Sequence, residues 1–104
     1  MLFDQGTPVP LRQYLKNHVV KTAYECGWAK LKNGELLDAA EGDGFEIFVT
    51  TDSNLRYQQN LLSRRIAIVV LGTTSWPRIQ NFASEITQVI DGVVSGAYSE
   101  VRIP

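Results

Sequence analysis

One short segment constrains the fold of this chain more than any other. Residues 66–71 read Ile-Ala-Ile-Val-Val-Leu, so they are apolar throughout and do not alternate with polar side chains. A strand of this composition is typical of the middle of a parallel sheet, where helices cover both faces. The segment therefore predicts an α/β domain built around a parallel sheet.

The rest of the chain alternates between segments with strand character and segments with helix character. Further strands are expected at residues 1–4, 18–23, 45–51 and 98–103, the last as a half-exposed edge strand. Helices are expected at residues 8–16, with Thr7 as N-cap and Pro8 as first helical residue, at 35–41, and as one long amphipathic helix after Trp76-Pro77. This order predicts an open, mostly parallel sheet of about five strands, with helices on both faces and right-handed crossovers.

Length and composition limit the chain to one core of modest size. With 104 residues and 44% hydrophobic content, we expect a single domain over residues 1–104. Ten basic residues against eleven acidic ones give a formal charge of −1. No overall field then attracts nucleic acid, so any such binding must rely on a local basic patch.

Cysteine use and hydropathy indicate a cytoplasmic protein without a membrane span. Cys26 is the only cysteine, which excludes an intramolecular disulfide and a thiolate zinc site and favours a reducing compartment. No apolar run approaches the roughly 20 residues of a membrane-spanning helix, and the N-terminus has no signal-type segment. A cytoplasmic location is therefore expected.

Three acidic residues stand where a parallel sheet brings loops together. Asp4 ends the first expected strand, Asp52 ends the third, and Glu35 falls in the first turn of the helix between them. Glu35 reaches the same rim if its helix packs beside the first strand. Three carboxylates without histidine or thiolate form an oxygen site that suits Mg²⁺ or Mn²⁺ better than zinc. Such an ion can promote phosphodiester hydrolysis.

The segments around these acids resemble the small bacterial PIN-like family. The resemblance lies in Leu2-Phe3-Asp4, in residues 31–37 and 49–60, and in the apolar run that follows, so it spans nearly the whole chain. It implies a PIN-like fold and matches Asp4, Glu35 and Asp52 to the metal-binding, catalytic acids of the family. Because the family is related to ribonuclease toxins of type II toxin–antitoxin pairs, it also implies metal-dependent cleavage of RNA and an antitoxin protein as a partner.

The candidate substrate-binding residues are a neutral amide and three arginines. Asn54 stands near the position where full PIN domains often carry a fourth acid. Arg56, Arg64 and Arg65 belong to the most basic stretch of the chain, and guanidinium groups bind phosphates through forked hydrogen bonds. Surface arginines are, however, usually only solvated.

Each acid also has a purely structural interpretation. Asp52 can cap the helix or loop that follows it, Asp4 can be an ordinary turn residue, and Glu35 can stabilise a helix N-terminus by its charge alone. In that case the chain is a PIN-like domain that binds a protein or RNA partner without efficient chemistry, as the missing fourth acid also suggests. The apolar C-terminal helix and edge strand are the candidate surface for a homodimer.

A receiver domain is a third alternative, with Asp52 as phosphoacceptor and Thr73 as the switch hydroxyl. Two absences disfavour it. Only one acid follows the first strand, where receivers use a pair, and no lysine follows the last strand to hold the acyl phosphate.

Overall fold

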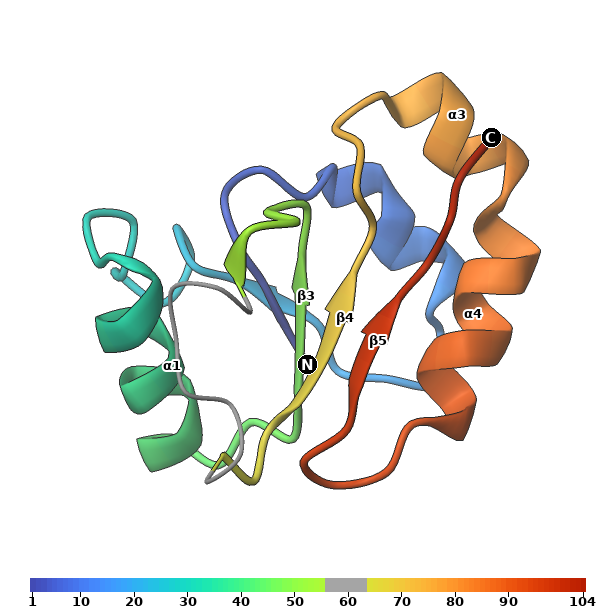
Figure 1. The fold of residues 1–104 in the computed structure, drawn as a ribbon. Coiled ribbons are helices and arrows are strands. Elements are labelled where there is room, and N and C mark those ends of the chain that lie inside the picture. The colour runs from blue at the N-terminus through green and yellow to red at the C-terminus, as the bar shows by residue number, and fades with distance from the viewer. Residues whose placement is uncertain (56–63) are drawn as a thin grey trace.

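The computed structural model describes residues 1–55 and 64–104 (Figure 1). Within these ranges, five strands form one sheet in the order β2-β1-β3-β4-β5, and every neighbouring pair is parallel. The predicted α/β fold with about five mostly parallel strands is therefore confirmed. The strands are β1 Leu2–Phe3, β2 Lys21–Thr22, β3 Ile47–Thr50, β4 Ala67–Val70 and β5 Tyr98–Glu100.

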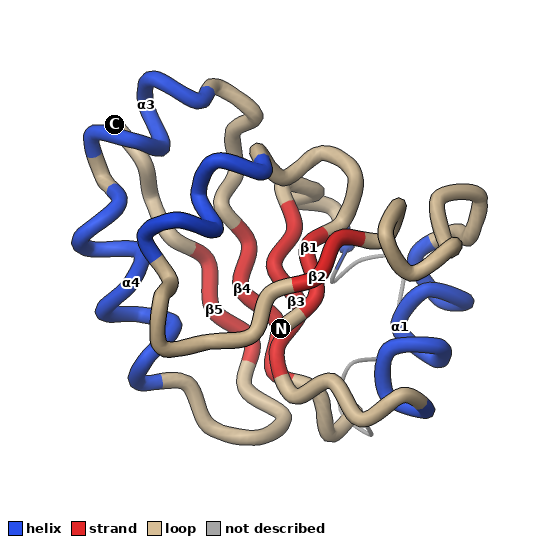
Figure 2. The backbone as a smooth tube through the Cα atoms, turned by 180° about the vertical axis from the view of Figure 1, so that it is seen from behind, coloured by secondary structure: helices blue, strands red, loops and turns tan. Residues whose placement is uncertain are grey.

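Helices cover both faces of the sheet, as predicted. One face carries the 3₁₀ helix η1 together with α3 and α4, and the other carries α1 (Figure 2). The bounds are η1 Val9–Tyr14, α1 Asn33–Gly42, α3 Trp76–Asn81 and α4 Ala83–Gly92. In the part of the chain that the structure describes, no helix is long and apolar enough to cross a membrane.

Strand β4 explains why residues 66–71 show no alternation. It lies between β3 and β5, and each of its four residues is at most 1% exposed. Because successive side chains point to opposite faces, Ile68 and Val70 enter the core under α1, whereas Val69 enters the core under η1 and α4. Burial of each such side chain stabilises the fold by about 1.5–3 kcal/mol. The predicted central strand is confirmed.

The C-terminal helix is interrupted, so the expectation of one continuous helix is wrong. At Phe82 the backbone leaves helical geometry (φ −112°, ψ 12°), and its ring packs against the core beneath α3 and α4. The expected apolar stripe nevertheless survives the break. Its buried residues are Ile79, Ala83, Ile86 and Ile90.

The expectation that all crossovers are right-handed is also wrong. The connections from β1 to β2 and from β4 to β5 move across the sheet in opposite directions. The first connection contains η1 and the second contains α3 and α4. Both lie on the same face of the sheet, as shown by the hydrogen bonds that Gln80 of α3 and Thr87 of α4 donate to Tyr14 of η1. Two parallel crossovers that move in opposite directions over one face have opposite hands, although right-handed connections are the strong general rule.

Candidate functional site

The strand order places a topological switch point between β1 and β3. From β1 the chain continues to β2 on one side, whereas β3, β4 and β5 extend on the other side. Loops diverge at the carboxyl ends of such strands, and open α/β sheets bind ligands there. Asp4 directly follows β1, and Asp52 follows β3 after one intervening residue. Two of the three predicted acids therefore flank the switch point.

The Asp4 carboxylate is held by hydroxyl and backbone donors. Its Oδ1 accepts hydrogen bonds from the Thr7 N–H at 3.1 Å and from Thr7 Oγ1 at 2.7 Å, and its Oδ2 accepts one from the Thr50 hydroxyl. Both threonines are buried, at 3% and 0% exposure. The carboxylate is thus fixed in orientation at the end of β1.

Thr7 does not cap a helix, so that prediction is wrong. The residue before η1 is Pro8, and no side chain caps this helix. The Thr7 hydroxyl instead lies within hydrogen-bond distance of Asp4 Oδ1 and of the Val49 carbonyl at 3.0 Å, and its single proton serves one of them at a time. Thr7 therefore ties the loop after β1 to both β1 and β3.

Gly6 allows this loop to lie against the end of β3. A Cβ atom at Gly6 would stand 2.6 Å from Thr51 Oγ1 and 3.8 Å from Asp4 Oδ1. The first separation is too short for carbon and oxygen. Any larger residue would force either the Thr51 hydroxyl or the loop that positions Asp4 to move.

The Asp52 carboxylate has one local and one distant partner. Its Oδ1 accepts from the Asn54 N–H at 2.9 Å, which is the local Asx turn that a structural role predicts. Its Oδ2 accepts from Asn33 Nδ2 at 2.8 Å, across from the start of α1. The Asp52 N–H donates to Thr50 Oγ1 at 3.1 Å. Because the Thr50 hydroxyl also donates to Asp4, it bridges the two acidic residues.

Glu35 lies in the first turn of α1, as predicted, but its contact is local. Its Oε1 accepts from the Lys32 N–H at 3.4 Å, which is one half of a capping box, and no N-cap side chain supplies the other half because lysine has no acceptor. Between residues 1 and 55 and from 64 onward, no three acidic, histidine or cysteine side chains lie close enough together to hold a metal ion. The structure thus connects Asp4 with Asp52, and Asn33 rather than Glu35 is the α1 side chain that contacts this pair.

The partners of Asp4 and Asp52 differ in charge from those of Asp38 and Glu41. Within the described ranges, these two carboxylates accept only from hydroxyl groups and amide N–H groups. Elsewhere, Asp38 and Glu41 share Arg64. The negative charge at the switch point is therefore hydrogen-bonded but not neutralised by a cation from the described part of the chain.

Two of the predicted substrate-binding arginines, Arg64 and Arg65, are not brought to these acids. Arg64 Nη1 contacts Asp38 Oδ1 at 2.6 Å and Glu41 Oε1 at 2.7 Å, and the Arg65 N–H donates to Glu41 Oε2 at 2.9 Å. Both arginines precede β4 and so lie at the amino edge of the sheet, opposite Asp4 and Asp52. Arg56 falls outside the described residues.

The contact between Glu41 and Arg64 at the amino edge shifts the pKa of both side chains. Burial raises the pKa of Glu41, but hydrogen bonds from Arg64 and from the Arg65 N–H outweigh it, so the net pKa lies below its ordinary value. The hydrogen bond to Glu41 raises the pKa of Arg64. These shifts indicate that the contact between α1 and the start of β4 stabilises the fold.

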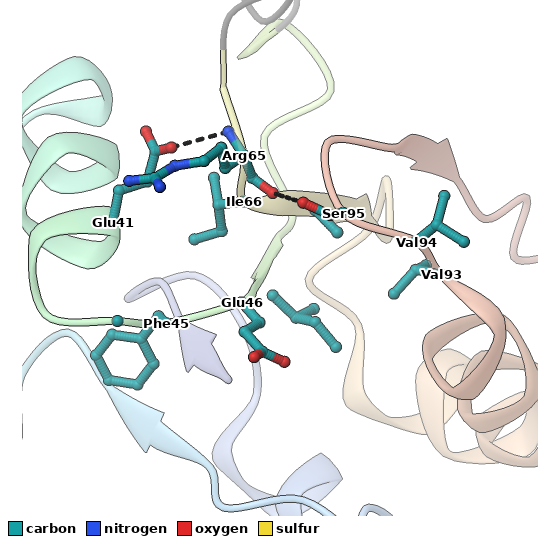
Figure 3. A pocket seen from close by; sticks show the side chains of 11 residues that line it. Glu41, Phe45, Glu46, Arg65, Ile66, Val93, Val94 and Ser95 are labelled. Atoms are coloured by element: carbon teal, nitrogen blue, oxygen red, sulfur yellow. Dashed lines mark hydrogen bonds between the residues drawn. The ribbon is translucent and has the colours of Figure 1, made fainter.

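A pocket of about 480 Å³ also opens at the amino edge (Figure 3). Glu46, Arg65, Ile66 and Val94 are among the residues that line it, and the Arg65 carbonyl accepts a hydrogen bond from Ser95 Oγ at 2.8 Å. None of the three predicted acids lines this pocket. Its position therefore separates it from the candidate site.

Sequence reasoning missed Thr50 and Asn33. Thr50 had a usable signal, because it ends an apolar strand just before an acid and must share an edge with Asp4. Asn33 read as a loop residue before Gly34, and only the packing of α1 shows that its amide reaches Asp52.

No family model matches the chain, and comparisons with curated proteins and with solved structures give no match either. Fold and site therefore define an α/β protein with a five-stranded parallel sheet in its described residues and two carboxylates at the switch point. The likeness to PIN-like proteins stays a prediction.

Proposed function

We propose that this protein is a PIN-like, metal-dependent ribonuclease that hydrolyses RNA phosphodiesters and binds its metal ion through the carboxylates of Asp4 and Asp52. The observation that carries the proposal is the position of these two carboxylates. They flank the switch point of the sheet, they are bridged by Thr50, and within the described ranges no cation neutralises them. A cation from solution can supply the missing charge.

The chemistry of the donors fits Mg²⁺ or Mn²⁺. Carboxylate oxygens are the preferred ligands of both ions, and Mg²⁺ sites commonly use one or two carboxylates together with water and substrate phosphate. Asp4 and Asp52 supply two carboxylates. Glu35 is the proposed third acid, and its 3.4 Å contact with the Lys32 N–H is long enough to be given up at small cost.

Each residue of the site has a role in this proposal. A bound ion would polarise the phosphoryl group and lower the pKa of a coordinated water. Asp4 and Asp52 would hold it. Thr7 and Thr50 orient the Asp4 carboxylate, and Asn33 orients that of Asp52 by its 2.8 Å hydrogen bond. Such supporting hydrogen bonds keep ligand oxygens in a productive geometry.

A second candidate function is a binding domain without chemistry. It is favoured by one observation, that all four carboxylate oxygens of Asp4 and Asp52 already accept hydrogen bonds from the protein. The site is then complete without an ion. An RNA or antitoxin partner, a homodimer and a cytoplasmic location belong to the proposal under either function.

Calorimetric titration with Mn²⁺ tests the proposal. We expect the wild type to bind and Asp52→Asn to lose binding, with RNA cleavage reduced at least about 100-fold. Asp43→Asn is the matched control, because it removes one exposed carboxylate next to α1 at the amino edge. It should bind Mn²⁺ like the wild type. No Mn²⁺ binding by the wild type would rule out the ribonuclease in favour of the binding domain.

A further inference from the structure

A second pocket, of about 270 Å³, opens at the carboxyl edge between β4 and β5. Its lining includes Ser53, Gly72, Glu100, Val101, Arg102 and Ile103. Ser53 directly follows Asp52, so this pocket adjoins the candidate site. Of the described residues that the sequence predicted to bind substrate, Asn54, Arg64 and Arg65, none lines it.

We propose that this pocket binds one nucleotide of single-stranded RNA, and that Arg102 holds its phosphate. The choice of RNA rests on the proposed function. An RNA molecule bound in this pocket would place a neighbouring phosphodiester beside Asp52. Arg102 would then pair with the phosphate of the RNA, whereas the proposed metal ion would pair with the two acids.

Arg102 is suited to this role because its charge is not used for folding. It is exposed and forms no ion pair within residues 1–55 and 64–104. Three other arginines are engaged. Arg12 pairs with Glu25, Arg64 pairs with Asp38 and Glu41, and Arg78 donates to the carbonyls of Ile103 and Pro104. A free guanidinium can form forked hydrogen bonds with a phosphate.

The size and the apolar side of the pocket favour a nucleotide. Ile103 is half-buried and offers an apolar surface to a ribose or base, whereas Val101 is 8% exposed and belongs mainly to the core. A volume of about 270 Å³ lies near the lower end of small-ligand pockets, at roughly 300 Å³, and suits one nucleotide. Apart from Gly72 and its two chain neighbours, no atom of the described residues lies within 4 Å of the place where a Cβ of Gly72 would stand, so they leave this rim open.

Glu100 lines the same pocket and opposes phosphate binding by its charge. Its Oε1 accepts a hydrogen bond from the Tyr98 hydroxyl at 3.0 Å, which holds it on β5. A phosphate at Arg102 remains under its repulsion, so replacing Glu100 and replacing Arg102 should change RNA affinity in opposite directions.

Fluorescence anisotropy with a short labelled single-stranded RNA, in EDTA to prevent cleavage, tests this subsite. We expect Arg102→Gln to raise Kd about tenfold, as for one charged hydrogen bond, and to lower the salt dependence of log Kd by about 0.7. Glu100→Gln should lower Kd. Arg65→Gln is the matched control, because it removes one exposed arginine charge at the opposite edge, and its Kd should stay within about twofold of wild type.

The outcomes separate this inference from the proposed function. Equal effects of Arg102→Gln and Arg65→Gln, or no RNA binding by the wild type, would overturn the subsite. If the wild type binds no Mn²⁺ but Arg102→Gln alone weakens RNA binding, the hydrolysis fails and the subsite stands. If Asp52→Asn abolishes cleavage while Arg102→Gln leaves Kd and KM unchanged, the hydrolysis stands and the subsite fails.

Discussion

The two edges of the sheet use acidic residues in different ways. At the amino edge, Asp38 and Glu41 of α1 are paired with Arg64, which leads into β4. At the carboxyl edge, Asp4 and Asp52 accept hydrogen bonds only from neutral groups of the described chain. Neutralised acids hold elements together, whereas oriented acids that keep their charge can still attract a cation. The edge that stabilises the fold is thus distinct from the edge suited to chemistry.

The largest expected effect concerns Arg64 at the amino edge. Its side chain is only 16% exposed, and Arg64→Met leaves the 19% exposed Glu41 carboxylate without its cation. We expect the free energy of unfolding to fall by about 3 kcal/mol, measured by urea denaturation. Arg65→Gln should change it by less than about 0.5 kcal/mol. A loss of Mn²⁺ affinity in folded Arg64→Met would contradict the separation of the two edges.

A smaller effect is expected for Thr50 at the carboxyl edge. Thr50→Val removes the hydroxyl that bridges Asp4 and Asp52 but keeps the shape of the side chain. We expect Mn²⁺ affinity to fall about 10–100-fold by calorimetry, because supporting hydrogen bonds orient metal ligands. Thr50→Ser should restore most of the affinity. Thr22→Val, at another buried threonine, should leave it unchanged. Equal affinities of Thr50→Val and the wild type would show that the bridge has no role in metal binding.

The smallest expected effect is the pH dependence of the stability that Glu41 contributes at the amino edge. The folded-state pKa of Glu41 lies below its ordinary value of 4.5, so its ionised form contributes stability above that pH. This contribution is lost as the pH falls through the folded-state pKa. Glu41→Gln should cost about 1 kcal/mol at neutral pH, and its difference from wild type should shrink below pH 4.5 in urea unfolding experiments. Curves that stay parallel down to acid pH would contradict this role of Glu41.

Some features of the site were predictable because they depend on neighbours in sequence. Asp4 and Asp52 follow apolar strand segments, and the carboxyl ends of parallel strands share an edge. By the same logic, Arg64 and Arg65 precede a strand and belong to the opposite edge. The sequence thus carries two conflicting signals here, because the basic composition of the stretch favours phosphate binding while its position before a strand favours the amino edge. The Thr7-Pro8 pair illustrates a different limit, since a hydroxyl that can cap a helix can equally bind a nearby carboxylate.

By itself, the sequence determined the elements whose signals are local. The apolar run of residues 66–71 marks a strand buried on both faces, and the two acids mark the ends of β1 and β3. Tertiary structure alone decided that Asn33 reaches Asp52, that α3 and α4 share a face with η1, and that Arg102 lies next to the candidate site. The physical reason is that local patterns specify which face of an element is buried. Which distant side chains then meet depends on how whole elements pack.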